Sequence, residues 1–227
     1  MIRFISFEGG DGSGKTTQLK LLESYLVSKG MACCCTREPG GTTLGRMLRK
    51  VLLEVDQKEI SSPAELFLYL ADRAQHVQEV VSPALERGTM VLCDRFSDST
   101  LAYQGFGRGI ELDLLRRLNR LASCGLIPDL TFLLDCPVDV GLWRIRKQVT
   151  AGLRSGASAK AERPLGQDRF EQEEIEFHER VRRGFLDLAR AEPDRFCVVD
   201  ALGSIEQVHK EIKRIVDERL AAQHNAK

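Results

Sequence analysis

The segment Gly9–Thr16 constrains the fold of this chain more than any other feature. Its sequence, GGDGSGKT, matches the pattern GxxxxGK[ST]. The apolar run Ile2–Phe7 precedes it, and Thr17–Leu22 has the composition of a helix start. In a strand–loop–helix unit of this kind, glycines let backbone N–H groups turn inward at the positive end of the helix dipole, where they bind phosphate oxygens. The segment therefore predicts a phosphate-binding loop between a strand and a helix.

Two side chains of this loop have specific expected roles. We expect Lys15 to neutralise the β- and γ-phosphates and the Thr16 hydroxyl to bind Mg²⁺. A merely glycine-rich turn would not need this Lys-Thr pair. The residues expected to contact the nucleoside triphosphate are Gly10, Asp11, Gly12, Ser13, Gly14, Lys15, Thr16 and Thr17.

Short apolar runs alternate with longer helix-like segments along the whole chain. The runs expected to form buried strands are Ile2–Phe7, Met31–Cys35, Thr89–Cys93, Leu130–Leu134 and Phe196–Val199. Alternation of strand and helix is typical of a parallel sheet covered by helices on both faces. The predicted fold class is therefore α/β, a P-loop NTPase with a five-stranded parallel sheet.

Capping patterns predict where three helices begin. Ser62–Glu65 (SPAE) combines a capping Ser with Pro and Glu, and Gly88 is expected to follow the end of that helical segment. Asp168–Glu171 resembles a second start, for a helix running to about Ala191, and Ser204–Gln207 opens the last helix.

One stretch, from Gly152 to Gln167, is small, polar and basic and has no apolar period. Because only a helix, a strand and a helix follow it, we interpret it as a mobile lid of about 152–167, with a linker as the alternative. The chain of 227 residues is then one domain over residues 1–227.

Composition limits the partners and the location. Lys plus Arg equals Asp plus Glu at 33 each, so we expect no nucleic-acid partner and only a local anion site. No apolar run is long enough to span a membrane, so we expect no membrane association. The odd count of 7 cysteines has no CxxC pair, which favours reduced thiols in a cytoplasmic protein.

A phosphate-binding loop alone does not separate enzymes from nucleotide-driven switch proteins. GTPase switches read guanine through an NKxD segment after a later strand. Here the corresponding strand ends in Leu133–Pro137 (LLDCP), and NKxD occurs nowhere in the sequence. We therefore favour an enzyme and keep a switch NTPase as the less favoured alternative.

Arginines at predicted strand ends indicate a second phosphate site, because the guanidinium fork binds phosphate bidentately. Arg37 begins the segment REPGGT after one strand, and Arg95 follows Asp94 after another. Phe67 and Arg73 lie six residues apart on a predicted helix, where we expect them on similar faces. A second phosphate held in line with the first is what a kinase requires.

Together these segments resemble bacterial thymidylate kinases. The matching pieces are FEGGDGSGKTTQ, REPGGT, LFLYLADRAQH, DRFSDSTLAYQGFGRG and DRFEQEEIEFHERVRRGF, which span nearly the whole chain in the family's order. The resemblance implies a homodimeric kinase that moves the γ-phosphoryl group of ATP to dTMP with Mg²⁺, giving dTDP and ADP. Helices near Leu66 and Leu114 are candidates for the dimer contact. Another P-loop nucleoside-monophosphate kinase is the nearest alternative.

The resemblance assigns five residues to the nucleoside of the acceptor. It implies that Phe67 stacks on thymine and that Arg73 donates to a base carbonyl. Thr100 and Gln104 correspond to contacts with the base edge, and Tyr103 to a side chain that crowds the 2′ side of the sugar. The alternative for Phe67 is an ordinary core position, since Phe on a helix is usually buried.

The resemblance also assigns residues to the phosphates. Arg37 and Arg95 would hold the acceptor phosphate, and Asp11 would lie near the sugar hydroxyl and the path of the phosphoryl group. The loop has no arginine after its acid, which resembles the bacterial subtype that supplies a catalytic arginine from the lid. Arg154 and Arg163 are the two candidates for that arginine.

Overall fold

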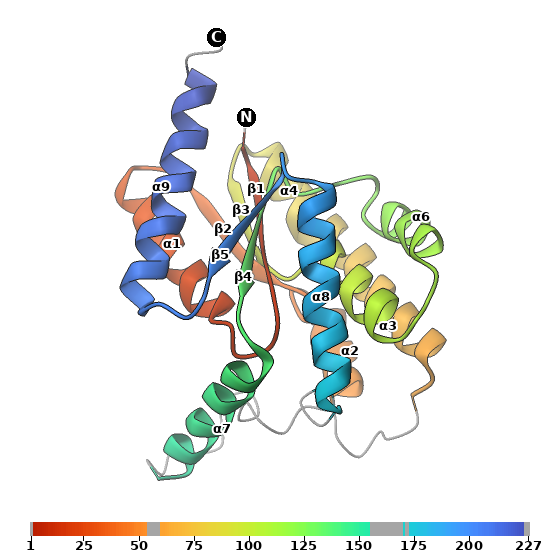
Figure 1. Ribbon diagram of the computed structural model, residues 1–227. Helices are drawn as coiled ribbons and strands as arrows, with labels where there is room; N and C mark the ends of the chain where they lie inside the picture. The colour runs from red at the N-terminus through yellow and green to blue at the C-terminus, as the bar shows by residue number, and fades with distance from the viewer. Residues whose placement is uncertain (1, 54–59, 155–169, 171–172, 225–227) are drawn as a thin grey trace.

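A five-stranded parallel sheet forms the centre of the molecule, with the strand order β2-β3-β1-β4-β5 (Figure 1). The computed structural model describes residues 2–53, 60–154, 170 and 173–224. The strands are β1 Phe4–Glu8, β2 Cys33–Arg37, β3 Met90–Asp94, β4 Leu130–Asp135 and β5 Phe196–Asp200. The expected α/β fold and its parallel sheet are confirmed.

Each strand reaches farther toward its carboxyl end than the apolar runs predicted. The additional terminal residues are Glu8, Arg37, Asp94, Asp135 and Asp200. All of them are charged, and Arg37 and Asp94 line the cavity described below. In open α/β sheets, ligands bind beyond the carboxyl ends of the strands. The hydrophobic pattern thus stops one or two residues before the strand does.

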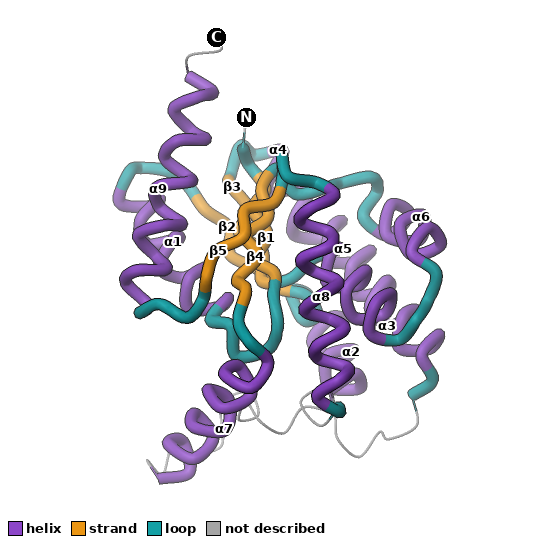
Figure 2. The backbone as a smooth tube through the Cα atoms, in the orientation of Figure 1, coloured by secondary structure: helices purple, strands orange, loops and turns teal. Residues whose placement is uncertain are grey.

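Helices cover both faces of the sheet (Figure 2). On one face α1 (Lys15–Ser28) and α9 (Ile205–His224) pack against the strands through residues such as Leu22 and Ile212. The helical elements over the other face are α3 Ser62–His76, a π-helical segment Val77–Val81, α4 Ser82–Glu86, α5 Ser97–Thr100, a π-helical segment Leu101–Gly107, α6 Leu112–Ala122 and α8 Ile175–Ala191. Two further helices are α2 Thr43–Leu53 and α7 Val138–Arg154.

The helix boundaries confirm two of the sequence predictions. Gly88 follows α4 with φ 75°, as expected for the residue after a helix. Ser204 and Gln207 form a reciprocal capping box, because the Ser204 N–H donates to Gln207 Oε1 (2.8 Å) and the Gln207 N–H donates to Ser204 Oγ (3.3 Å).

Two other predicted helix starts were wrong. The cap of α3 is Ser61, whose hydroxyl accepts from the Ala64 N–H, so the start lies one residue earlier than the Ser62 cap that we expected. Glu65, expected in a capping box, is fully buried. Helix α8 begins at Ile175 and not near Phe170, although it ends at Ala191 as predicted.

The expected lid falls largely outside the described residues. Residues 152–154 form the last part of α7, and residues 155–167 are not described. Among the helices that are described, none is both long and apolar enough to cross a lipid bilayer.

Candidate functional site

The phosphate-binding loop turns from β1 into α1 through glycines in left-handed conformations. Gly12 has φ 74° and Gly14, the residue before α1, has φ 95°. Such angles favour glycine over other residues. Gly12 also packs against the backbone of Gly141 in α7, where a Cβ atom on either residue would collide with the other segment. The expected strand–loop–helix unit is therefore present, and α7 rests directly on the loop.

Lys15 is buried within this loop. Its ammonium group donates to the carbonyl oxygens of Gly10 (2.8 Å) and Gly9 (3.1 Å). Burial and the nearby Arg95 lower the pKa of Lys15 to about 8. A cation held at the mouth of a loop whose N–H groups bind phosphate suits the β- and γ-phosphates.

Thr16 and Asp94 form the part of the site that fits a divalent cation. Thr16 Oγ1 donates to Asp94 Oδ2 at 2.5 Å, and Asp94 ends β3, which pairs with β1. Among the described residues there is no cluster of three His, Cys, Asp or Glu side chains that could enclose a metal. Mg²⁺ bound with ATP needs no such cage, because phosphates and water supply most of its oxygen ligands. A hydroxyl and a carboxylate therefore fit this ion.

Arg95 connects the turn after β3 with the phosphate-binding loop. Its backbone has φ 70°, which is uncommon for a residue other than glycine. Its guanidinium donates to Asp11 Oδ1 (2.5 Å), to the Gly9 carbonyl oxygen (3.0 Å) and to the Tyr103 hydroxyl (3.1 Å). The Tyr103 hydroxyl in turn donates to Asp11 Oδ2 at 3.2 Å. Burial opposes ionisation of Asp11, but Arg95 and Lys15 outweigh it and lower the pKa of Asp11.

Glu8 fixes the turn that carries Arg95. It is fully buried at the end of β1, and its carboxyl group accepts from the Phe96 N–H (2.7 Å) and from Ser99 Oγ (2.6 Å). Ser99 Oγ accepts from Arg95 Nη1 at 3.1 Å. Burial and the nearby Asp98 raise the pKa of Glu8 to about 8. Sequence reasoning missed this role because Glu8 follows an apolar strand and shows no pattern of its own.

Arg73 is the centre of a second hydrogen-bonded network and has an exposed fraction of only 2%. Its Nε donates to Glu38 (2.9 Å), Nη1 to Thr100 (2.9 Å) and Asn119 (2.6 Å), and Nη2 to the carbonyl oxygen of Phe96 (3.1 Å). These bonds to described residues occupy four of the five N–H groups of a guanidinium. One Nη2 hydrogen is left for a ligand in the cavity.

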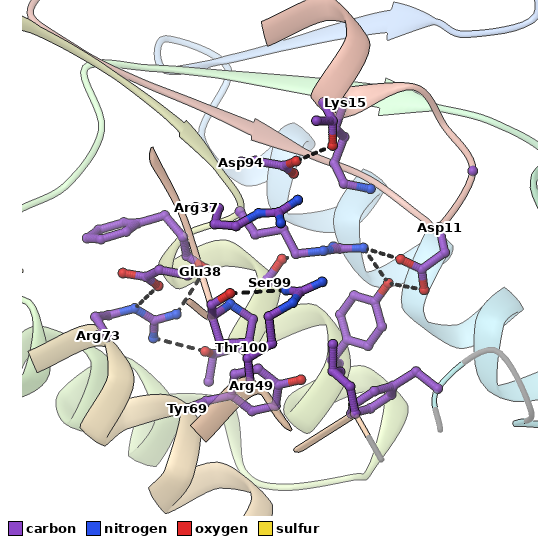
Figure 3. A pocket seen from close by; sticks show the side chains of 18 of the residues that line it. Asp11, Lys15, Arg37, Glu38, Arg49, Tyr69, Arg73, Asp94, Ser99 and Thr100 are labelled. Atoms are coloured by element: carbon purple, nitrogen blue, oxygen red, sulfur yellow. Dashed lines mark hydrogen bonds and ion pairs between the residues drawn. The ribbon is translucent and has the colours of Figure 1, made fainter. Parts of the chain in front are cut away.

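A cavity brings most of the predicted residues together at the carboxyl edge of the sheet (Figure 3). The predicted residues in its wall are Asp11, Gly12, Gly14, Lys15, Thr16, Thr17, Arg37, Arg73, Arg95, Thr100, Tyr103 and Gln104. The wall also contains residues that sequence reasoning did not assign to the site, among them Glu38, Arg49, Tyr69, Asp94 and Phe170. Gly10 and Ser13 belong to the phosphate-binding loop but not to this wall.

The prediction that Phe67 faces the base was wrong. Phe67 is 62% exposed and does not line the cavity, whereas Tyr69 does. At 3.6 residues per turn, six residues rotate the helix by about 240°, so Phe67 and Arg73 lie on different faces. Tyr69 and Arg73 are four residues apart, a spacing that is only about 40° more than one full turn of the helix. Tyr69 therefore lies on the same face as Arg73. That spacing is the sequence signal that would have found Tyr69.

Asp94 had a usable signal as well, because a carboxylate at the end of the strand beside β1 is where P-loop enzymes hold their metal. Arg37 and Arg49 both lie in the cavity wall, and Arg49 donates to the carbonyl oxygen of Pro39 at 3.0 Å.

The two candidates for a lid arginine are untested. The side chain of Arg154 and the whole of Arg163 lie outside the part of the chain that is described.

Comparisons with known proteins give a consistent result. The family model described as thymidylate kinase matches residues 7–212. The thymidylate kinase of Desulfovibrio desulfuricans is 52% identical over 205 residues, which cover 90% of each chain. That of a Synechococcus strain is 51% identical over 217 residues, covering 96% of this chain and 95% of its own. The crystal structure of thymidylate kinase from Ehrlichia chaffeensis superposes with a TM-score of 0.72 at 34% identity, covering 94% of this chain and 97% of that one.

Proposed function

This chain belongs to the thymidylate kinase family and transfers the γ-phosphoryl group of ATP to dTMP, and we propose how its side chains divide that work. The observation that carries this division is the contact between Arg95 and Asp11. In this contact Arg95, whose guanidinium suits an acceptor phosphate, lies within one hydrogen bond of the loop that we assign to the donor phosphates. In-line transfer requires this proximity, because positioning and charge stabilisation supply most of the catalysis.

On the donor side, we assign the phosphates of ATP to the loop Gly10–Thr17 and to the ammonium group of Lys15. Thr16 and Asp94 would hold Mg²⁺, as their short contact supports. When bound, the ion neutralises charge on the phosphate oxygens. Lys15 contributes a second positive charge from a position that its bonds to Gly9 and Gly10 define.

On the acceptor side, we assign the phosphate of dTMP to Arg95 and Arg37, which both line the cavity. Asp11 is already bound by Arg95 and Tyr103, so its carboxylate orients the arginine. Tyr103 lies in the cavity wall with its hydroxyl bonded to Asp11 of the loop, where its ring would fill the space on the 2′ side of a deoxyribose.

The base is assigned to Tyr69, Arg73, Gln104 and Thr100, which all line the cavity. Tyr69 replaces Phe67 as the ring that stacks on thymine. Arg73 would use its remaining N–H to donate to a base carbonyl. Because both Arg73 and Gln104 are buried, an unmatched base would leave polar groups without partners, which is costly.

Charge that develops on the transferred phosphoryl group calls for a further cation. We propose that Arg154 or Arg163 supplies it from the 152–167 segment, within a single domain spanning residues 1–227. Changing each arginine to Ala separately would identify it, because the catalytic one should lower kcat strongly with little change in the KM for dTMP.

We also propose a homodimer. Leu44, Met47 and Val51 are exposed on α2 at spacings of three and four residues, so they form one apolar stripe. Helix α2 packs against α3, which exposes Phe67 (Figure 1). An exposed apolar stripe of this kind is typical of an interface. A cytoplasmic location is supported by the seven cysteines, all of which are free thiols.

A panel of acceptors with ATP tests the activity. We expect dTMP to be phosphorylated in preference to dUMP, UMP and CMP, with one ADP formed for each dTDP. Equal turnover of CMP would instead indicate another nucleoside-monophosphate kinase. Slow hydrolysis of ATP or GTP that no monophosphate accelerates would indicate a switch protein.

A further inference from the structure

Glu65 is a fully buried carboxylate in α3 that none of the roles above uses. Gln104 Nε2 donates to Glu65 Oε1 at 2.9 Å. Arg108 donates from Nε to Oε1 (3.3 Å) and from Nη2 to Oε2 (3.2 Å), which supplies the counter-charge. Gln104 itself has an exposed fraction of only 2% and lines the cavity. A buried charge is thus placed directly behind a side chain assigned to the base.

The direction of the Gln104 hydrogen bond follows from the chemistry of its partner. An ionised carboxylate has only acceptor oxygens, so the group of Gln104 that faces Glu65 must be the N–H₂ group. The amide oxygen of Gln104 then points the other way. Within residues 2–53, 60–154, 170 and 173–224, no hydrogen bond to this oxygen is present, and it is not among the fully buried polar atoms that lack a partner. Glu65 therefore makes Gln104 an acceptor toward the cavity.

Arg73 completes the pattern, because it has one N–H left for the cavity after its bonds to described residues. Gln104 thus presents an acceptor to the cavity, and Arg73 presents a donor. Thymine offers the complementary pair, an N3–H donor beside the O4 acceptor. Cytosine offers the opposite pair, an N3 acceptor beside the N4 amino donor, so it would meet two mismatches.

We propose that Glu65 is a positioning residue that determines base specificity, by fixing the Gln104 amide so that the site accepts an N3–H and rejects cytosine. This inference rests on the proposed function, since it takes the base to lie against Arg73 and Gln104. Glu65 acts through Gln104 and does not touch the base.

The test is Glu65→Gln, assayed with dTMP, dCMP and dUMP. With Gln at position 65, satisfying Arg108 turns an N–H₂ group toward Gln104, which can then reverse its own amide. We expect the ratio of kcat/KM for dTMP to that for dCMP to fall about tenfold, the effect of one mispaired buried polar group. The ratio for dTMP to dUMP should stay within about twofold, because uracil has the same N3–H and O4 edge. Ratios are independent of the fraction of protein that folds.

Two further variants make the result specific. Glu173 also pairs with Arg108 (2.7 Å) but is not a partner of Gln104, so Glu173→Gln should leave the dTMP-to-dCMP ratio unchanged. The double variant Glu65→Gln with Gln104→Glu should restore the ratio, because a carboxylate at position 104 would again turn an acceptor oxygen toward the base.

The proposal is overturned if Glu65→Gln leaves the dTMP-to-dCMP ratio within about twofold of wild type, if Glu173→Gln lowers the ratio equally, or if the dTMP-to-dUMP ratio changes just as much. Failure of the proposed function is distinguishable from these outcomes, because it would appear in the wild-type protein as an absence of preference for dTMP.

Discussion

Arg95 Nη2 lies 2.5 Å from Asp11 Oδ1, which joins the residue after β3 to the loop after β1. The same carboxylate accepts from the Tyr103 hydroxyl, so one acid holds two side chains of the acceptor region. The phosphate-binding loop therefore has a role beyond the proposed binding of the donor. It also sets the position of the arginine that is assigned to the acceptor phosphate.

Replacing Asp11 by Asn should separate these two duties. The variant keeps an acceptor for Arg95 but loses the charge, so we expect kcat/KM for dTMP to fall about tenfold to a hundredfold with a smaller change in the KM for ATP. Initial rates with each substrate varied in turn would measure this. Asp187→Asn, which removes an exposed ion pair with Arg190, is the matched control. An equal loss in the control, or no loss at Asp11, would refute the assignment.

Tyr69→Ala should raise the KM for dTMP by about tenfold, because stacking of a base on an aromatic ring contributes about 1–3 kcal/mol. The KM for ATP should not change. Phe67→Ala, two residues earlier on the same helix, should leave both constants unchanged when assayed at protein concentrations that keep the oligomer intact. If Phe67→Ala raised the KM for dTMP and Tyr69→Ala did not, the original sequence prediction would be correct after all.

Glu8→Gln should stabilise the protein in a pH-dependent way. The pKa of Glu8 is raised from 4.5 to about 8, so between these values the folded state binds a proton that the unfolded state has released. The free energy of unfolding therefore falls as pH rises through this window. Gln removes that penalty, so the Tm of the variant should exceed that of wild type increasingly up to about pH 8 and match it near about pH 4. A Tm difference that is constant with pH would contradict the prediction.

Lys15→Ala should lower the rate of dTDP formation by about a thousandfold, because the charge acts on the reacting phosphates. Cooperative thermal unfolding should persist, since α1 packs through other residues such as Leu19 and Leu22. The exposed Lys20 on the same helix provides the control variant Lys20→Ala. Activity near the wild-type level in Lys15→Ala would overturn the role of the loop.

Met47→Glu should convert the proposed dimer to monomer. Met47 is 63% exposed in the centre of the α2 stripe, and a charge there would be buried on association. Sedimentation velocity at micromolar protein measures the change, with the exposed Lys210→Glu on α9 as the control. A wild-type protein that is already monomeric, or a variant that dimerises normally, would remove α2 from the interface.

The parts of the fold that could be predicted are those in which a local pattern and the final environment agree. The five apolar runs became strands because both faces of the sheet are covered, and Gly9–Thr16 became the loop because its glycines adopt angles that other residues avoid. The prediction that α8 begins near Phe170 was wrong, because a favourable capping pattern does not require a helix to begin there, and the helix begins at Ile175.

The site was predictable in its charged residues and less so in their supports. Arg73 and Arg95 had a chemical reason to be noticed, but Glu38 and Asn119 acquire a function only by contact with Arg73, across 35 and 46 residues of sequence. Tyr103 and Gln104 were predicted through the family resemblance alone, because they lie on a π-helical segment, Leu101–Gly107, and single-turn departures of this kind have no periodic signal in a sequence.

The network around Arg73 has a consequence for how base preference can evolve. Its partners come from the segment after β2, from the turn before α5, from α5 itself and from α6. A mutation that retunes Arg73 for a different base leaves several buried partners unmatched at once, so the intermediate loses fold stability before it gains a new substrate. A single substitution is therefore not enough to shift the base preference toward another pyrimidine. A change of specificity needs coordinated substitutions in segments that are distant in the gene.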